Sequence, residues 1–260
     1  MSRGLNWLRG LAGGEALAGF PASVKVVDGE LGNRAARFLA VVPDAQNPFP
    51  RARNGEVGLL EGWGLAKAVD QAIEADRHGA KRVLVALVDV PSQAYGRREE
   101  ALGIHQALAG AVDAYARARL AGHPVIGLLV GKAMSGAFLA HGYQAQRLIA
   151  LDDAGVMVHA MGKAAAARIT LRSVEELEVL AAKVPPMAYD LENYASLGLL
   201  WERVAVGDAE QPGAADLARV RDTLVCAVVD IGDSTDLSGR LGAENREASS
   251  RVREMLRAQW

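Results

Sequence analysis

The sequence is poor in cysteine, and neither sign of charge is in strong excess. A single cysteine, Cys226, occurs among 260 residues, which excludes an internal disulfide and a cysteine-based zinc site. It stands among valines, so we expect a buried and unreactive thiol. The 29 lysines and arginines nearly balance the 31 aspartates and glutamates, and no basic block points to nucleic acid. We therefore expect neither a nucleic-acid partner nor a bound metal.

Long apolar runs are also missing. No stretch of about 18 apolar residues is present, so we predict no membrane-spanning helix. The opening MSRGLNWLRGLAGG carries arginines around a broken apolar segment, which does not fit a signal peptide. Together with the lone cysteine, these features favour a cytoplasmic protein. Half of the residues are hydrophobic, and the length suits one large domain with a substantial core.

The middle of the chain alternates apolar strands with amphipathic helices. The run Arg82–Val90 is apolar on both faces, as a central parallel strand covered by helices would be. Val125–Val130 is a second such run. Further strands are predicted at Val24–Val27, Ala35–Val42, Arg147–Leu151 and Val156–His159. Helices are predicted at residues 56–79, along a long run that includes residues 104–115, and at 162–169, 173–184, 214–229 and 245–258. This alternation predicts parallel pairing with right-handed crossovers.

Three parts of the chain are expected to have different roles. Residues 1–23 form an amphipathic lead in which Trp7, Leu8 and Leu11 pack against the body or a partner. Residues 24–212 form the α/β core. Residues 213–260 form a C-terminal helical extension of the same domain.

The core is organised around the stretch from Pro124 to Gly142, PVIGLLVGKAMSGAFLAHG. We expect a strand to Val130, a short loop beginning at Gly131, and a helix that opens at Ser135 and Gly136. Backbone N–H groups in the first turn of a helix lack internal partners, and the helix dipole is positive there. An oxygen that gains negative charge would be stabilised at that point. A tight strand-to-helix turn without chemistry is the alternative.

Two familiar motifs are excluded at this stretch. A phosphate-binding loop needs a glycine at position 126 and serine or threonine at 133, where the chain has Ile126 and Ala133. A hydrolase nucleophile needs glycines two residues either side of Ser135, and both positions are alanine. Ser135 is therefore a poor covalent nucleophile. Because ligands gather at the C-terminal ends of parallel strands, the loops Pro91–Gly96 and Gly131–Gly136 should meet there. Two of their N–H groups would form an oxyanion hole.

Two long segments resemble a known superfamily. The segments DVPSQAYGRREEALGIHQALAGAV and HPVIGLLVGKAMSGAFLAHGYQAQRLIAL resemble the carboxyltransferase branch of the crotonase superfamily, whose corresponding segments run DTPGAYPG and GEGGSGGALA. The segment SVEELEVLAAKVPPMAYDLENYASLGLL, from Ser173 to Leu200, resembles the gamma subunits of biotin-independent malonate decarboxylases. The likeness spans roughly residues 25–205.

The resemblance implies a crotonase-like spiral of ββα units followed by C-terminal helices. It also implies partners: a homologous beta subunit, an acyl carrier protein (delta subunit) and an acyl-carrier transferase (alpha subunit). The carrier bears a phosphoribosyl-dephospho-CoA arm, and no biotin is expected. Malonyl thioester on the carrier would be decarboxylated between the beta and gamma subunits. The rival functions are an alpha-type carboxyltransferase subunit of a biotin-dependent acyl-CoA carboxylase, and a mainly structural partner of a catalytic beta subunit.

The resemblance also assigns candidate site residues. The backbone amides of Gly136 and Ser135 would hold the oxyanion, with Gly131 shaping the turn and Gly96, in AYG, as the candidate of the other loop. His159 is a candidate proton donor, although a structural histidine fits the pattern as well. Lys132, Arg51 and Arg53 are candidates for carboxylate or phosphate contacts, with plain solvent exposure as the alternative.

The chain departs from the carboxyltransferase pattern in both loops. GKAMSGA stands in place of GEGGSGG, and Met134 would fill space that a carboxyl carrier needs. Ser92 replaces the glycine of DTPG, which puts a backbone donor at that point in doubt.

Overall fold

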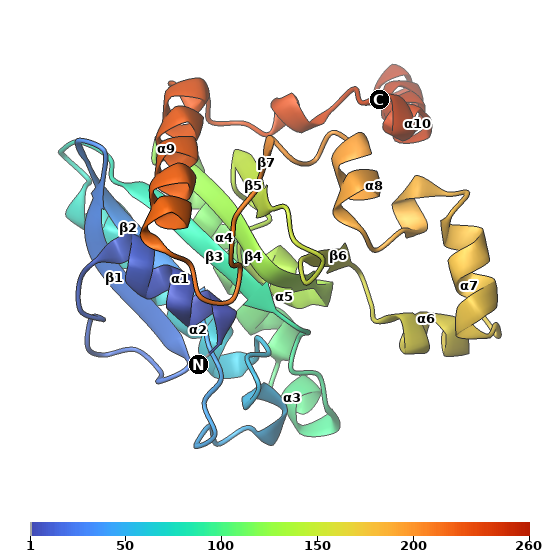
Figure 1. Ribbon diagram of the computed structural model, residues 1–260, viewed down its shortest axis with the longest axis horizontal. Coiled ribbons are helices and arrows are strands. Elements are labelled where there is room, and N and C mark those ends of the chain that lie inside the picture. The colour runs from blue at the N-terminus through green and yellow to red at the C-terminus, as the bar shows by residue number, and fades with distance from the viewer. Residues whose placement is uncertain (1) are drawn as a thin grey trace.

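A seven-stranded sheet forms the centre of the computed structural model, which describes residues 2–260 (Figure 1). The strands are β1 (Val24–Leu31), β2 (Arg34–Val41), β3 (Val83–Val90), β4 (Val125–Met134), β5 (Arg147–Leu151), β6 (Met157–His159) and β7 (Glu202–Val204). They are ordered β1-β2-β3-β4-β5-β7, and β6 pairs with β4. Only the β1–β2 pair is antiparallel among these described strands. The predicted mixed α/β core with central parallel strands is confirmed.

Helices cover both faces of the sheet. They are α1 (Arg3–Ala12), α2 (Leu59–Ala75), α3 (Arg97–Ala101), α4 (Ile104–Leu120), α5 (Ser135–Ala140), α6 (Lys163–Ile169), α7 (Val174–Ala181), α8 (Leu191–Ser196), α9 (Ala214–Ile231) and α10 (Glu247–Gln259). In Figure 1, α1 and α9 lie in front of the sheet and α2 and α4 behind it, while α6, α7, α8 and α10 lie to one side. None of the helices within residues 2–260 is long and apolar enough to cross a membrane.

The N-terminal helix is part of the hydrophobic core. Trp7, Leu8 and Leu11 are almost fully buried and pack in one cluster with residues of the sheet. The Trp7 indole Nε1 donates a hydrogen bond of 2.8 Å to the carbonyl oxygen of Ala209. Packing of this lead against the body is thus confirmed. The division into segments 1–23, 24–212 and 213–260 stays a prediction.

Strand β4 is longer than predicted, and the expected loop from Gly131 to Met134 is wrong. Its first half pairs with β5 through Ile126 to Leu129, while Lys132, Ala133 and Met134 pair with β6. The register against β3 shifts between Val88 and Val90, which lets the strand change neighbours. Pairing with a strand some 25 residues further along the chain supplies the hydrogen bonds that keep this glycine-containing segment extended.

Cys226 is exposed, contrary to the expectation of a buried thiol. The buried face of α9 consists of Val220, Leu224, Ala227, Val228 and Ile231. These residues recur every three or four positions, with Ala227 and Val228 side by side, which is the pattern of one helix face. Cys226 falls outside that face, although apolar neighbours flank it in the sequence.

His141 is a buried structural histidine. Its Nδ1 lies 3.1 Å from the hydroxyl of Tyr115, and its Nε2 lies 2.9 Å from the carbonyl oxygen of Leu87. Burial lowers the pKa of His141 to about 4. The neutral ring is therefore the form that the core accommodates.

We expect the free energy of unfolding to fall as the pH drops from about 6.5 to about 4. In this pH range His141 is protonated in the unfolded chain but stays neutral in the folded chain. Acid therefore lowers the free energy of unfolding, by up to about 3 kcal/mol. Urea unfolding at several pH values measures the slope. His141→Gln should reduce the slope, and the same change at the exposed His105 should not. An unchanged slope in the His141 variant would contradict the assignment.

Candidate functional site

The junction of β4 and α5 is a sharp turn built on one strained residue. Ser135 has φ = 59°, the left-handed conformation that residues other than glycine seldom adopt. Its hydroxyl donates a hydrogen bond of 2.9 Å to the carbonyl oxygen of Ala160, next to the end of β6. This bond holds the turn in place. Such strain persists only where the surrounding structure imposes it, and it concentrates at functional sites.

A cavity of about 770 Å³ opens at this turn. Ser135 and Gly136 line it from the β4–α5 junction, His159 from the end of β6, and Gln93 from the loop that follows β3. The other lining residues are mostly apolar and come from α5, α6, α8 and the turn around Pro185–Met187. No lysine, arginine, aspartate or glutamate lines this cavity within the described chain. The site is therefore neutral apart from its histidine.

The Gly136 amide is already hydrogen-bonded. Its N–H donates to Oε1 of Gln93 at 2.6 Å. The loop after β3 thus meets the β4–α5 junction, at the edge of the sheet that the strand order predicted, but the side chain of Gln93 makes the contact. Sequence reasoning missed Gln93. The available signal was its place in PSQAYG, between the end of a buried strand and the predicted donor Gly96.

Gly131 lies beside Asp89 and does not line the cavity. A Cβ on Gly131 would come within 2.1 Å of Oδ1 of Asp89, so only glycine admits this carboxylate. Asp89 accepts hydrogen bonds from the backbone N–H groups of Gly4 and Lys132, each at 3.2 Å. Gly131 therefore makes room for a link between α1 and β4. The side chain of Lys132 is exposed.

The remaining predicted residues also lie away from the cavity. Gly96 precedes α3, where a Cβ would come within 2.3 Å of Oε2 of Glu99. Arg53 donates through Nε to the carbonyl oxygen of Asn47 at 2.9 Å, which braces its own loop. Arg51 is exposed in the short turn Pro50–Ala52. Of the candidates, the structure brings together Ser135, Gly136 and His159.

His159 is held in a neutral state. Burial lowers its pKa, and its Nδ1 lies 2.9 Å from the carbonyl oxygen and 3.2 Å from the backbone nitrogen of Met161. Its ring stacks on Tyr189, with centroids 3.8 Å apart and planes 13° from parallel. A neutral imidazole is a weak acid, so these contacts suit positioning better than proton donation. The proton-donor role stays a prediction.

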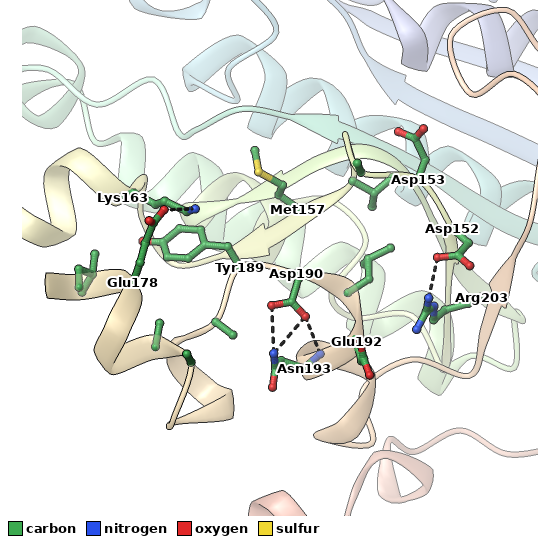
Figure 2. Close-up of a pocket in the computed structure, with 17 residues that line it drawn as sticks. Asp152, Asp153, Met157, Lys163, Glu178, Tyr189, Asp190, Glu192, Asn193 and Arg203 are labelled. Atoms are coloured by element: carbon green, nitrogen blue, oxygen red, sulfur yellow. Dashed lines mark hydrogen bonds and ion pairs between the residues drawn. The ribbon is translucent and has the colours of Figure 1, made fainter. Parts of the chain in front are cut away.

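A second cavity, of about 580 Å³, shares Tyr189 with the first (Figure 2). Its acidic lining residues are Asp152, Asp153, Glu178, Asp190 and Glu192. Its two basic residues are both paired: Lys163 with Glu178 and Arg203 with Asp152, each at 2.7 Å. The excess negative charge repels carboxylates and phosphates. Between the two, the neutral cavity at Gly136 repels an anion less.

The solved structures with a fold similar to that of this chain include crotonase-fold carboxyltransferases. Transcarboxylase 12S, solved with methylmalonyl-coenzyme A and methylmalonic acid bound, is similar to this chain with a TM-score of 0.65 at 20% identity, over 86% of this chain and 40% of that one. At this identity the likeness shows the fold alone. The predicted crotonase-like fold is confirmed.

The family follows from closer matches. The sequence profile described as "Malonate decarboxylase gamma subunit" matches residues 52–260, and the chain belongs to this family of decarboxylase (carboxy-lyase) subunits. A subunit of a Pseudomonas malonate decarboxylase hetero-tetramer, solved in complex with coenzyme A, is 74% identical over the whole of both chains, with a TM-score of 0.97. A subunit of the Pseudomonas MdcD-MdcE hetero-dimer is 70% identical with a TM-score of 0.93, over 100% of this chain and 99% of that one.

One curated relative is more distant. The malonyl-S-ACP:biotin-protein carboxyltransferase MADD of Malonomonas rubra is 35% identical over 180 residues, which make up 67% of this chain. The matched region spans 62% of that relative's length.

Proposed function

We propose that this chain acts with a homologous beta subunit to decarboxylate malonyl-S-acyl carrier protein to acetyl-S-acyl carrier protein. The neutral cavity at Gly136 is the observation that carries the proposal. Similar chains occur in a Pseudomonas hetero-dimer and hetero-tetramer, which supports a heteromeric enzyme. The Malonomonas rubra relative is named for malonyl-S-ACP, which supports the substrate.

The cavity suits the chemistry of this reaction. The bond between the α-carbon and the carboxylate breaks, CO₂ leaves, and the electron pair moves through the α-carbon onto the thioester oxygen. The α-carbon then takes up one proton. One hydrogen-bond donor to such an oxygen is worth about 10²–10³ in kcat. Because no basic side chain lines the cavity, the malonyl carboxylate would have no cation to hold it in the ground state.

The carrier's phosphoribosyl-dephospho-CoA arm would deliver the thioester from outside the subunit. A cavity of about 770 Å³ with mostly apolar walls accommodates the acyl end. The phosphates would stay outside it, where the exposed Lys132 and Arg51 are available. An alpha subunit that reloads a delta carrier protein, and a cytoplasmic location, belong to the same proposal.

Reconstitution tests the proposed function. The purified chain is mixed with its beta subunit and malonyl-S-acyl carrier protein, and CO₂ release is followed. We expect release from the pair at a rate well above the sum of the two subunits alone. Equal release by the beta subunit alone would leave this chain a structural partner, and no release from the pair would reject the proposal.

A biotin-dependent reaction is the second candidate, and the name of the Malonomonas rubra relative favours it. In that case malonyl-S-acyl carrier protein would give its carboxyl group to a biotin protein. The same assay separates the two reactions when avidin is added. Avidin-resistant CO₂ release without a biotin protein supports decarboxylation, whereas a strict requirement for a biotin protein supports carboxyl transfer.

A further inference from the structure

We propose that the side-chain amide of Gln93 donates the hydrogen bond to the thioester oxygen of the substrate, in place of the main-chain amide of Gly136. This inference rests on the proposed decarboxylation and names the group that binds the reacting oxygen. Gln93 would be a catalytic residue, because its Nε2 would contact the oxygen on which negative charge develops.

The contact with Gly136 fixes which way the Gln93 carboxamide faces. A backbone N–H can only donate, so the side-chain atom 2.6 Å away must be the acceptor Oε1. The donor Nε2 therefore points away from Gly136. It has no hydrogen-bond partner within residues 2–260 and is not among the fully buried polar atoms that lack one. Since Gln93 lines the cavity, Nε2 is a free and oriented donor at its edge.

The backbone on both sides of Gln93 is held in place. Ser92 accepts a hydrogen bond from the N–H of Val57 at 3.1 Å, and Ala94 donates one to the carbonyl oxygen of Val57 at 2.8 Å. With Oε1 fixed as well, the side chain needs little rearrangement when charge develops on the substrate. Preorganisation of this kind is what makes an oxyanion donor effective.

The alternative, direct binding at Gly136, requires an exchange. The thioester oxygen would have to displace Oε1, and a thioester carbonyl is a weaker acceptor than a carboxamide. Binding at Nε2 breaks no existing contact. The Gly136 N–H also polarises the carboxamide, which strengthens Nε2 as a donor. The hydrogen bond from the Gly136 N–H to Oε1 therefore orients the Gln93 carboxamide, in addition to occupying the Gly136 amide.

The reaction balances without a change in Gln93. CO₂ leaves as the carbon–carbon bond breaks, and the electron pair forms the enolate, whose oxygen accepts the hydrogen bond from Nε2. The proton that later reaches the α-carbon comes from another group. Gln93 is therefore neither protonated nor deprotonated in the cycle.

Two variants of Gln93 test the inference in the reconstituted complex with the beta subunit. Gln93→Glu keeps an acceptor for Gly136 but removes both donor hydrogens, and Gln93→Met removes the carboxamide and leaves the Gly136 amide open. We expect each to lower kcat for CO₂ release by about 10²-fold or more, with a smaller change in KM. Gln71→Glu, on the exposed face of α2, is the matched control and should keep the wild-type kcat.

The outcomes separate the competing roles. Unchanged thermal unfolding and unchanged assembly with the beta subunit, together with the loss in kcat, support Nε2 as the donor. A Gln93→Met complex with wild-type or higher kcat would overturn the inference and make Gly136 the donor. If the wild-type complex releases no CO₂, the proposed function is wrong. If the wild-type and Gln93→Met complexes are equally active, the proposed function stands and only the role of Gln93 is wrong.

Discussion

Gly136→Ala is expected to lower kcat for decarboxylation by about 10²-fold while the chain stays folded. A Cβ at this position would come within 2.4 Å of Oε1 of Gln93, so the carboxamide must swing away. The variant keeps the backbone N–H of residue 136 and displaces the Gln93 side chain that this N–H supports. Steady-state CO₂ release in complex with the beta subunit measures the effect.

Gly79→Ala is the matched control for this substitution. A Cβ on Gly79 meets no atom within 4 Å, so kcat should match the wild type. Circular dichroism of both variants verifies the fold. Full activity of Gly136→Ala would show that the Gln93–Gly136 pair takes no part in the reaction.

Trp7→Ala should reduce the free energy of unfolding by about 4 kcal/mol. Removal of a fully buried tryptophan leaves a cavity, and such substitutions cost roughly 3–5 kcal/mol. The hydrogen bond to the carbonyl oxygen of Ala209 is lost as well. Urea unfolding measures the change. Trp260→Ala, at a fully exposed side chain, should stay within about 0.5 kcal/mol of the wild type. Equal effects of the two variants would refute the role of α1 in the core.

The sequence predicted the strands and helices that are determined by their own local residue pattern. The predicted strand Arg147–Leu151 matches β5, and Arg82–Val90 differs from β3 by one residue, because these runs are mostly apolar. The helix predicted from Ser173 also forms, and the capping box at its start needs only two local hydrogen bonds. Elements of this kind need no information about distant partners.

Elements that depend on distant segments were not predictable in this way. The second half of β4 is a strand because β6 lies beside it, and the three residues of β7 are a strand because β5 does. The same limit applies to the site. Strand order indicated that the loops after β3 and β4 would meet, but the partner of Gly136 depends on where one side chain, that of Gln93, reaches across the gap.

The carboxylate of Asp89 has a practical consequence for protein engineering. It joins Gly4 of the first helix to Lys132 in the strand that carries the cavity, and Arg3 adds a hydrogen bond to the carbonyl oxygen of Val130. A fusion or affinity tag that replaces residues 3–12 would remove the hydrogen bond from Gly4 to Asp89. It would also expose the apolar core residues that pack against Trp7. Expression vectors should therefore keep that helix intact, even when only the region around the cavity is wanted.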